Sequence, residues 1–266
     1  MYDPAQIPVW IDEHYYINER LGGGEWSDVY LVTDRSAGGT YAVKVLKPDY
    51  FADERVRSRF LTEAKAMARL VHPNIVRIYD VGGAMADEPA IVMEYCEGGD
   101  LREHTPQRGL PADIVARITL FILLGMVAAH KVGCIHRGLC PESIFLDADL
   151  NPKVADFGTA LLEQNPHVAT RAAEALGEFL YSPPEQRYDA RKVDVRSDIY
   201  GVGAMMWFML MGKDPPDLSL ATRSPEVVQD IHPYLRQIIV RACHHSPDAR
   251  YQTASAMGKA VRKLFS

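Results

Sequence analysis

Three consecutive glycines stand before a segment that is expected to be a strand. Residues 22–24 are Gly-Gly-Gly, and residues 26–32 are rich in β-forming side chains. Because glycine has no side chain and adopts positive φ easily, a glycine-rich loop lets the backbone come close to phosphate groups. The pattern predicts a phosphate-binding loop, and an ordinary turn is the simpler alternative.

One lysine and one glutamate are candidates for an ion pair. Lys44 lies on the following predicted strand, where a period of two places it on the same face as Ala42. Glu63 lies in a predicted helix beside the apolar stripe that contains Phe60 and Met67. A carboxylate there needs a partner, and Lys44 is the candidate. A solvated strand lysine and a solvated helix glutamate are the alternatives.

Two groups of elements must position these residues. The first part of the chain predicts four strands, at residues 26–32, 40–46, 75–81 and 90–95. One helix lies between them, with apolar residues at a period of 3.6 from residue 56 to Val71, and Pro73 ends it. The second part predicts four helices, at residues 111–130, 196–211, 227–243 and 253–265. The sequence therefore predicts a small β-rich lobe and a larger α-rich lobe, with a boundary near residues 94–98.

Composition favours a globular protein and excludes several classes. Of the 266 residues, 47% are apolar and 24% are charged, and the formal net charge is −6. A mildly acidic chain argues against nucleic acid or anionic lipid as the partner. Four cysteines are too few for a disulfide framework, so we expect free thiols in the cytoplasm. We expect no signal peptide and no membrane segment, because the most apolar stretch, residues 114–129, is too short to cross a bilayer.

Further motifs follow in a fixed order, at residues 135–145 (IHRGLCPESIF), 156–158 (DFG), 183–185 (PPE), Asp198 and Arg250. Together with the glycine loop, Lys44 and Glu63, this set resembles the eukaryotic-like protein kinase family, and most closely its bacterial Ser/Thr members. The resemblance covers about residues 15–265. It implies an α+β bilobal kinase fold in one domain over residues 1–266. The N-lobe would span about 1–93, the hinge 94–97 and the C-lobe about 98–266.

The resemblance also implies roles for individual residues. Gly22 and Gly24 would cover the phosphates of ATP, Lys44 would contact the α- and β-phosphates with Glu63 as its ion-pair partner, and Asp156 would bind Mg²⁺. The implied contacts to adenine and ribose are Leu21, Val29, Ala42, Met93, Glu94 to Cys96, Asp100 and Phe145.

Other residues would hold the structure. His136 and Phe157 would stack in a hydrophobic spine with Met67 and Ile78. The implied anchors of the helical lobe are the ion pair between Glu185 and Arg250, and Asp198 beneath the loop of residues 136–137. Arg137 would pair with a phosphorylated Thr170, and an unmodified loop is the alternative.

The departures from the family pattern gather at the chemistry. Gly138 replaces the aspartate that accepts the substrate proton, Cys140 replaces a lysine, and Ser143 replaces a metal-binding asparagine. Ser27 replaces the third glycine of the loop, and Glu142 is the only carboxylate in the catalytic-loop motif. These losses predict a pseudokinase, not an enzyme, that acts as a regulatory or scaffolding module on a protein partner such as a regulatory target or an active kinase. ATP and Mg²⁺ are its candidate ligands, and a weak or unconventional Ser/Thr kinase using ATP is the alternative.

Trp26 lies at the tip of the glycine loop. Its position predicts an exposed ring that could contact a partner. Packing within the hairpin is the alternative.

Overall fold

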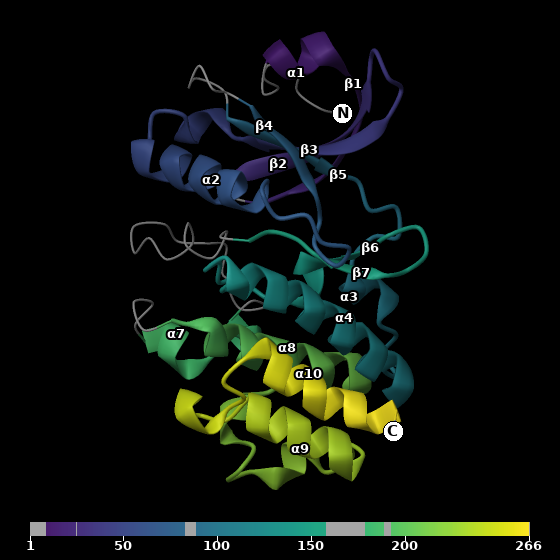
Figure 1. The fold of residues 1–266 in the computed structure, drawn as a ribbon, viewed down its shortest axis with the longest axis vertical. Helices are drawn as coiled ribbons and strands as arrows, with labels where there is room; N and C mark the ends of the chain where they lie inside the picture. Colours follow the sequence, from purple (N-terminus) through teal and green to yellow (C-terminus); the bar gives the residue numbers. More distant parts are fainter. Residues whose placement is uncertain (1–8, 25, 83–88, 158–178, 189–192, 266) are drawn as a thin grey trace. The chain divides into compact units, whose positions relative to one another are not determined.

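The computed structural model describes residues 9–24, 26–82, 89–157, 179–188 and 193–265. The chain forms two compact units, which are treated separately below. Unit 1 comprises residues 1–72 and 76–97, and unit 2 comprises residues 73–75 and 98–266. Figure 1 shows a sheet in unit 1 and a set of helices in unit 2.

Unit 1 is built on a five-stranded antiparallel sheet with the order β1-β2-β3-β5-β4. The strands are β1 (Tyr15–Gly23), β2 (Ser27–Asp34), β3 (Thr40–Leu46), β4 (Ile78–Gly82) and β5 (Ala90–Glu94). Alternate residues such as Tyr30, Val32, Val43 and Val45 form a buried core on one face of the sheet. The short helix α1 (Val9–His14), which the sequence analysis did not predict, adds Ile11 to this core.

Helix α2 (Glu54–Met67) begins at Asp53, whose carboxylate accepts hydrogen bonds from the backbone N–H groups of Arg55 and Val56. Its buried stripe contains Val56, Phe60, Ala64 and Met67, as the period of 3.6 predicts. The predicted extension to Val71 is wrong. The helix ends four residues earlier, and Val71 is 68% exposed because it no longer shares the buried face.

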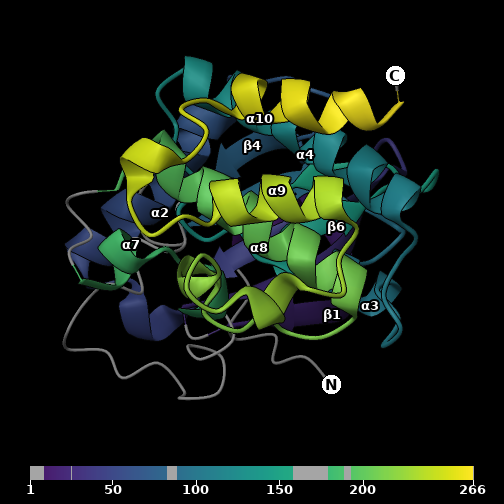
Figure 2. The same cartoon turned by 90° about the horizontal axis from the view of Figure 1, so that it is seen from below.

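Unit 2 is mainly helical, with one two-stranded sheet. Its helices are α3 (Leu101–His104), α4 (Ala112–Lys131), α7 (Pro184–Tyr188), α8 (Val195–Met211), α9 (Pro233–Ala242) and α10 (Ala254–Arg262). Strands β6 (Ile144–Leu146) and β7 (Pro152–Val154) pair antiparallel. Short 3-10 turns include η3 (Pro141–Ser143), η5 (Leu218–Leu220), η6 (Pro225–Val228), η7 (Pro247–Ala249) and η8 (Lys263–Phe265). Figure 2 shows α9 and α10 side by side next to α8.

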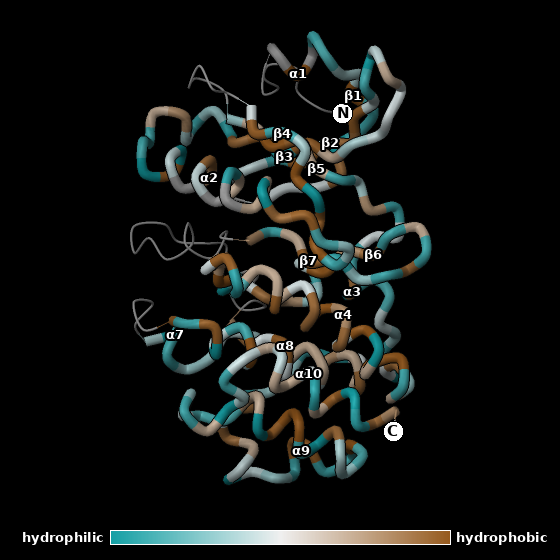
Figure 3. Tube along the Cα trace, in the orientation of Figure 1, coloured by the Kyte–Doolittle hydropathy of each residue, from teal (hydrophilic) through white to brown (hydrophobic). Residues whose placement is uncertain are grey.

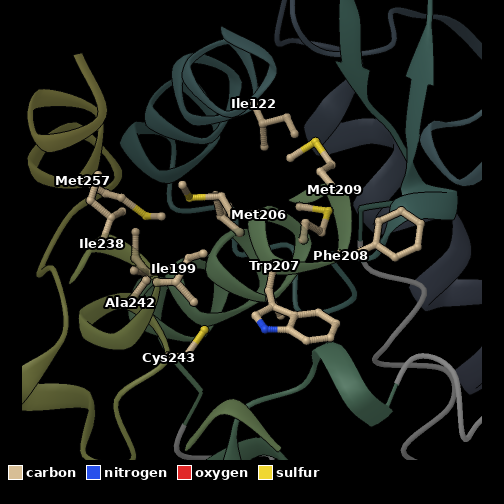
Figure 4. Packing of buried hydrophobic residues seen from close by; sticks show 14 of the residues in the cluster. Ile122, Ile199, Met206, Trp207, Phe208, Met209, Ile238, Ala242, Cys243 and Met257 are labelled. Atoms are coloured by element: carbon tan, nitrogen blue, oxygen red, sulfur yellow. The ribbon is translucent and has the colours of Figure 1, made fainter. Parts of the chain in front are cut away.

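The core of unit 2 surrounds α8, which is buried from Ser197 to Met209 as its apolar sequence predicts. Met206 packs among residues of α4, α9 and α10, and Trp207 donates a hydrogen bond of 2.8 Å from Nε1 to the carbonyl oxygen of Val227 (Figure 4). The predicted helix over residues 227–243 is split, because Pro233 forces an extended conformation on the residue before it.

Helix α4 is, among the described residues, the one helix long and apolar enough to cross a membrane (Figure 3). Half of its apolar window is buried inside the unit, where α4 packs against α8 and α10. This packing is that of a core helix, as the sequence predicts for residues 114–129.

Candidate functional site

The glycine loop joins β1 to β2 in unit 1. A Cβ atom added to Gly22 or Gly24 would meet no atom within 4 Å, so the backbone at both positions borders open space. A Cβ atom on Gly23 would lie 2.1 Å from Asp28 Oδ1 and 2.8 Å from the carbonyl oxygen of Ser27. Packing therefore requires glycine at position 23, which the sequence analysis did not predict.

Trp26 is not exposed, and the prediction of an exposed ring is wrong. Only 8% of the residue is accessible, and its ring centroid lies 4.5 Å from that of Tyr50 in the 3-10 turn η2 (Pro48–Tyr50). The alternation of β2 places Trp26 on the same face as Tyr30, which belongs to the buried core, and this explains its burial. Glu25 lies outside the described residues.

The other face of the sheet carries the residues implied to contact the nucleotide. Val29 pairs with Lys44 across β2 and β3, and Ala42 pairs with Met93 across β3 and β5. Directly paired residues point to the same side, so these four side chains share one face. Leu21 is exposed near the end of β1. The ion pair between Lys44 and Glu63 stays a prediction, because the Glu63 side chain lies outside the described part of α2.

The implied hinge begins at the end of β5. The backbone N–H of Glu94 donates to the carbonyl oxygen of Arg77 at 2.8 Å, and its carboxylate accepts from the backbone N–H of Arg77 at 3.1 Å. Cys96 is buried, with 7% of its surface exposed. Glu94 is therefore tied to the strand β4 side of the sheet.

In unit 2, a buried histidine organises the catalytic loop. His136 is fully buried, and burial lowers its pKa. Its Nε2 lies 2.7 Å from the carbonyl oxygen of Ala155, and its Nδ1 accepts from the backbone N–H of Gly138 at 3.2 Å. This pattern assigns the neutral tautomer with the proton on Nε2. Phe157 stacks against the same ring at 4.6 Å between centroids.

Asp198 at the start of α8 accepts hydrogen bonds from the loop backbone. Its two carboxylate oxygens accept from the N–H groups of His136 at 2.9 Å and Arg137 at 2.8 Å, and one of them also lies 2.7 Å from His130 Nε2. Arg137 has a φ of 70°, a left-handed conformation that L-residues rarely adopt. Its carbonyl oxygen accepts a bond of 2.6 Å from Gln186 Nε2 on α7, so both sides of this strained residue are held.

The three positions that depart from the family pattern have no polar side chain directed at a substrate. Gly138 has no side chain, and Cys140 is 5% exposed and belongs to the hydrophobic core. Ser143 is 4% exposed, and its hydroxyl donates to the carbonyl oxygen of Cys140 at 2.9 Å while accepting from the Cys140 N–H at 3.1 Å. The serine hydroxyl is thus used to close the turn η3.

Glu142 is engaged by a residue that the sequence analysis missed. Its carboxylate pairs with Arg102 of α3, which also bonds Asp214 Oδ1 at 2.7 Å. Asp214 accepts a second bond of 2.8 Å from the hydroxyl of Tyr181, and burial together with this carboxylate raises the pKa of Tyr181. Arg102 and Asp214 are 112 residues apart, so no local sequence pattern predicts their contact.

Asp156 and Phe145 lie beside this loop within unit 2. Asp156 is half-buried with a φ of 56°, which turns the chain directly after Ala155. Phe145 is half-buried on β6 and forms a bridge with Asp100. The carboxylate of Asp100 accepts from the Glu103 N–H at 3.0 Å and so caps α3.

Only limited metal ligation is available from the chain. Among the described residues, no group of three or more His, Cys, Asp or Glu side chains could hold a metal ion. Mg²⁺ is commonly bound by one or two carboxylates together with substrate phosphates and water. Asp156 fits that requirement as a single protein carboxylate.

A buried ion pair supports the loop from below. Arg250, whose side chain is fully buried, bonds both carboxylate oxygens of Glu185, at 2.7 and 2.8 Å. Glu185 also accepts from Ser197 at 2.9 Å, which joins α7 to α8. These donors overcome desolvation and lower the pKa of Glu185. Thr170 lies outside the described residues.

A family model described as the protein kinase domain matches residues 15–264. The chain belongs to the protein kinase family. It is 34% identical over 269 residues to the Ser/Thr-protein kinase PknL of Mycobacterium tuberculosis, covering 96% of this chain and 66% of that protein. It is 33% identical over 276 residues to PknB of Mycobacterium leprae, covering 97% of this chain and 44% of that protein. The chain therefore spans less than two thirds of these curated relatives.

Solved structures agree with this assignment. The crystal structure of the Mycobacterium tuberculosis PknI kinase domain matches with a TM-score of 0.71 and 28% identity, over 94% of this chain and 96% of that one. The predicted bilobal kinase fold, with a β-sheet N-lobe and a helical C-lobe, is confirmed, and the relatives are bacterial Ser/Thr kinases.

The prediction that the chain is not an enzyme is contradicted. Relatives at 31–34% identity are named Ser/Thr protein kinases, and this kinship points to an enzyme. The changes at three loop positions suggested otherwise because the sequence analysis gave the catalytic side chains more weight than the rest of the domain.

Proposed function

We propose that this chain is an ATP-dependent Ser/Thr protein kinase with low catalytic activity. The observation that carries the proposal is the complete set of hydrogen bonds around the catalytic loop. His136 joins the loop to Ala155, directly before Asp156, and Asp198 holds the loop backbone from α8. The loop is therefore shaped for its task even where its side chains have changed.

Each unit contributes residues to the proposed nucleotide contacts. In unit 1, Lys44 would neutralise charge on the phosphates, and the open backbone at Gly22 and Gly24 would approach their oxygens. In unit 2, Asp156 would hold Mg²⁺, which when bound neutralises charge on the β- and γ-phosphates. These electrostatic contributions depend on residues that the chain retains.

Without a carboxylate at Gly138, the reaction is slow but chemically feasible. The substrate hydroxyl oxygen forms a bond to the γ-phosphorus, the bond from that phosphorus to the β-γ bridging oxygen breaks, and the hydroxyl proton passes to water or to a phosphoryl oxygen. General base catalysis typically contributes about 10²–10⁴-fold, and the remaining acceleration comes from positioning and charge neutralisation. We therefore expect a rate lower by about that factor than with a catalytic aspartate.

The substrate would be a protein that presents a serine or threonine hydroxyl. All four cysteines are free thiols, which fits a reducing cytoplasm where ATP is available. Glu142 is an inferior replacement base, because Arg102 already pairs with it.

The decisive experiment is phosphotransfer from radiolabelled ATP. Purified chain would be incubated with Mg²⁺ or Mn²⁺ and generic protein substrates, beside the variants Lys44→Met and Asp156→Asn. We expect slow incorporation on serine or threonine that both variants abolish. No incorporation by the parent, or equal incorporation by the parent and Lys44→Met, would overturn the proposal.

A thermal-shift titration tests nucleotide binding separately. Ligand that binds only the folded protein stabilises it in proportion to the logarithm of its concentration above Kd. We expect ATP to raise the Tm with Mg²⁺ present and to do so less without it, because Cys140 supplies no positive charge.

A further inference from the structure

Lys47 contacts the tip of the glycine loop from the end of β3. Its ammonium Nζ lies 2.6 Å from the carbonyl oxygen of Gly24. Its backbone N–H donates to the carbonyl oxygen of Trp26 at 2.8 Å, which continues the β2–β3 pairing by one step. One lysine thus binds both sides of the loop tip.

The same ammonium group lies near a buried carboxylate. Asp28 has only 8% of its side chain exposed, and its Oδ1 accepts from Arg20 Nη2 at 2.7 Å and lies 3.9 Å from Lys47 Nζ. A buried carboxylate is stabilised by such cationic partners. Asp28 therefore holds Lys47 in place for its bond to Gly24.

This group of contacts lies on the opposite face of the sheet from Lys44. Asp28 pairs with Val45, whereas Val29 pairs with Lys44, and neighbouring residues of a strand point to opposite sides. Trp26 lies on the Asp28 face and packs on Tyr50. The loop is consequently fastened from the face that bears the unit 1 core, and the Lys44 face stays uncovered by these contacts.

We propose that Lys47 is a positioning residue that fixes the glycine loop for the phosphates of ATP. The inference rests on the proposed kinase function. Ordering a flexible backbone costs conformational entropy, and a loop that is ordered before binding avoids that cost. Lys47 therefore favours phosphate-bearing nucleotides, which reach the loop, and has no effect on adenosine, which lacks phosphates.

The test compares Lys47→Ala with the parent, with Lys47→Arg and with Lys65→Ala. Lys65 is an exposed lysine of α2, so its removal matches the loss of charge without touching the loop. Calorimetric titration would measure the Kd of ATP with Mg²⁺ and the Kd of adenosine for each protein. We expect Lys47→Ala to weaken ATP binding about 5- to 10-fold, which corresponds to a hydrogen bond of ordinary strength, and to change adenosine binding less than about twofold.

The conservative variant Lys47→Arg should retain most of the affinity for ATP, and Lys65→Ala should behave like the parent. Equal weakening of ATP and adenosine by Lys47→Ala, or no weakening of either, would overturn the inference.

Hydrogen exchange without nucleotide separates this inference from the proposed function. We expect the amides of residues 22–28 to exchange faster in Lys47→Ala than in the parent and Lys65→Ala. Equal exchange would overturn the role of Lys47 in the loop, whatever the affinity for ATP. If exchange differs but the parent binds no ATP, the proposed function fails, and the phosphate role of Lys47 fails with it.

Discussion

The glycine loop of unit 1 and the catalytic loop of unit 2 differ in what each has retained. In the glycine loop, the groups expected to meet a nucleotide are backbone atoms at Gly22 and Gly24, and side chains such as Lys47 and Asp28 hold them from behind. In the catalytic loop, the expected acting groups are side chains, and those at positions 138, 140 and 143 have been replaced. The hydrogen bonds that shape this loop are nevertheless present.

This difference separates the shape of a site from its reactive groups. His136 and Asp198 bond the backbone of the catalytic loop, so their contacts do not depend on which side chain occupies position 138. The loop can lose its reactive groups without losing its conformation. If that is correct, restoring the side chains should restore chemistry, and removing the framework should unfold the unit.

The largest expected effect is a gain of activity. We predict that the combined substitutions Gly138→Asp, Cys140→Lys and Ser143→Asn raise the phosphotransfer rate about 10²–10⁴-fold, because they restore a base, a cation and a metal ligand. Initial rates with radiolabelled ATP would measure it, and adding Lys44→Met to the triple variant is the control. An unchanged rate in a folded triple variant would show that the loop framework is not in a productive conformation.

The next effect concerns the framework of unit 2. Arg250→Met leaves Glu185 without the guanidinium that bonds both of its oxygens, and breaking a buried ion pair costs about 3–5 kcal/mol of stability. Urea denaturation would measure the loss. The double variant Glu185→Gln with Arg250→Met should lose less, because no unpaired charge stays buried; an equal loss would contradict this explanation.

A third prediction tests unit 1. Gly23→Ala should lower stability by about 1–3 kcal/mol, because the added methyl group would overlap Asp28 and the Ser27 carbonyl. Gly22→Ala is the matched control, since its methyl group would meet no atom within 4 Å, and it should change stability by less than about 1 kcal/mol. Urea denaturation of both variants checks the order, and a reversed order would show that the glycine loop is not packed as described.

The smallest effect is a pH dependence from His136. Its folded pKa lies below its ordinary value of 6.5, so below pH 6.5 the unfolded chain binds more protons and stability falls with pH until the folded pKa is reached. The slope is at most about 1.4 kcal/mol per pH unit. Urea denaturation at pH 5.5 and 7.5 should show a smaller pH difference for His136→Gln, whose amide can still donate to Ala155. Identical pH differences would exclude His136 as the source.

Periodic patterns in the sequence predicted the elements that bury one regular face. The stripe of α2, the all-round burial of α8 and the strands β2 and β3 follow from periods of 3.6 and 2. The failures occur where a local feature overrides the period. Pro233 divides the predicted helix over 227–243, and the strand alternation turns Trp26 into the unit instead of out to solvent.

For the candidate site, the motifs located the loops, and the structure revealed how they are held. Ser143 was compared with a metal-binding asparagine, yet its hydroxyl bonds the backbone of Cys140. The contact of Arg102 with Glu142 and Asp214 joins three distant segments. Such contacts depend on tertiary packing, which a single sequence does not display.

The burial of the cysteines has a consequence for covalent labelling. Cys140 and Cys96 are 5% and 7% exposed, and burial strongly raises the pKa of Cys243, which keeps its thiol protonated and unreactive. Cys134 is the half-buried member of the four. A thiol-directed reagent would therefore modify Cys134 first, so an electrophilic inhibitor aimed at the loop would gain little from Cys140.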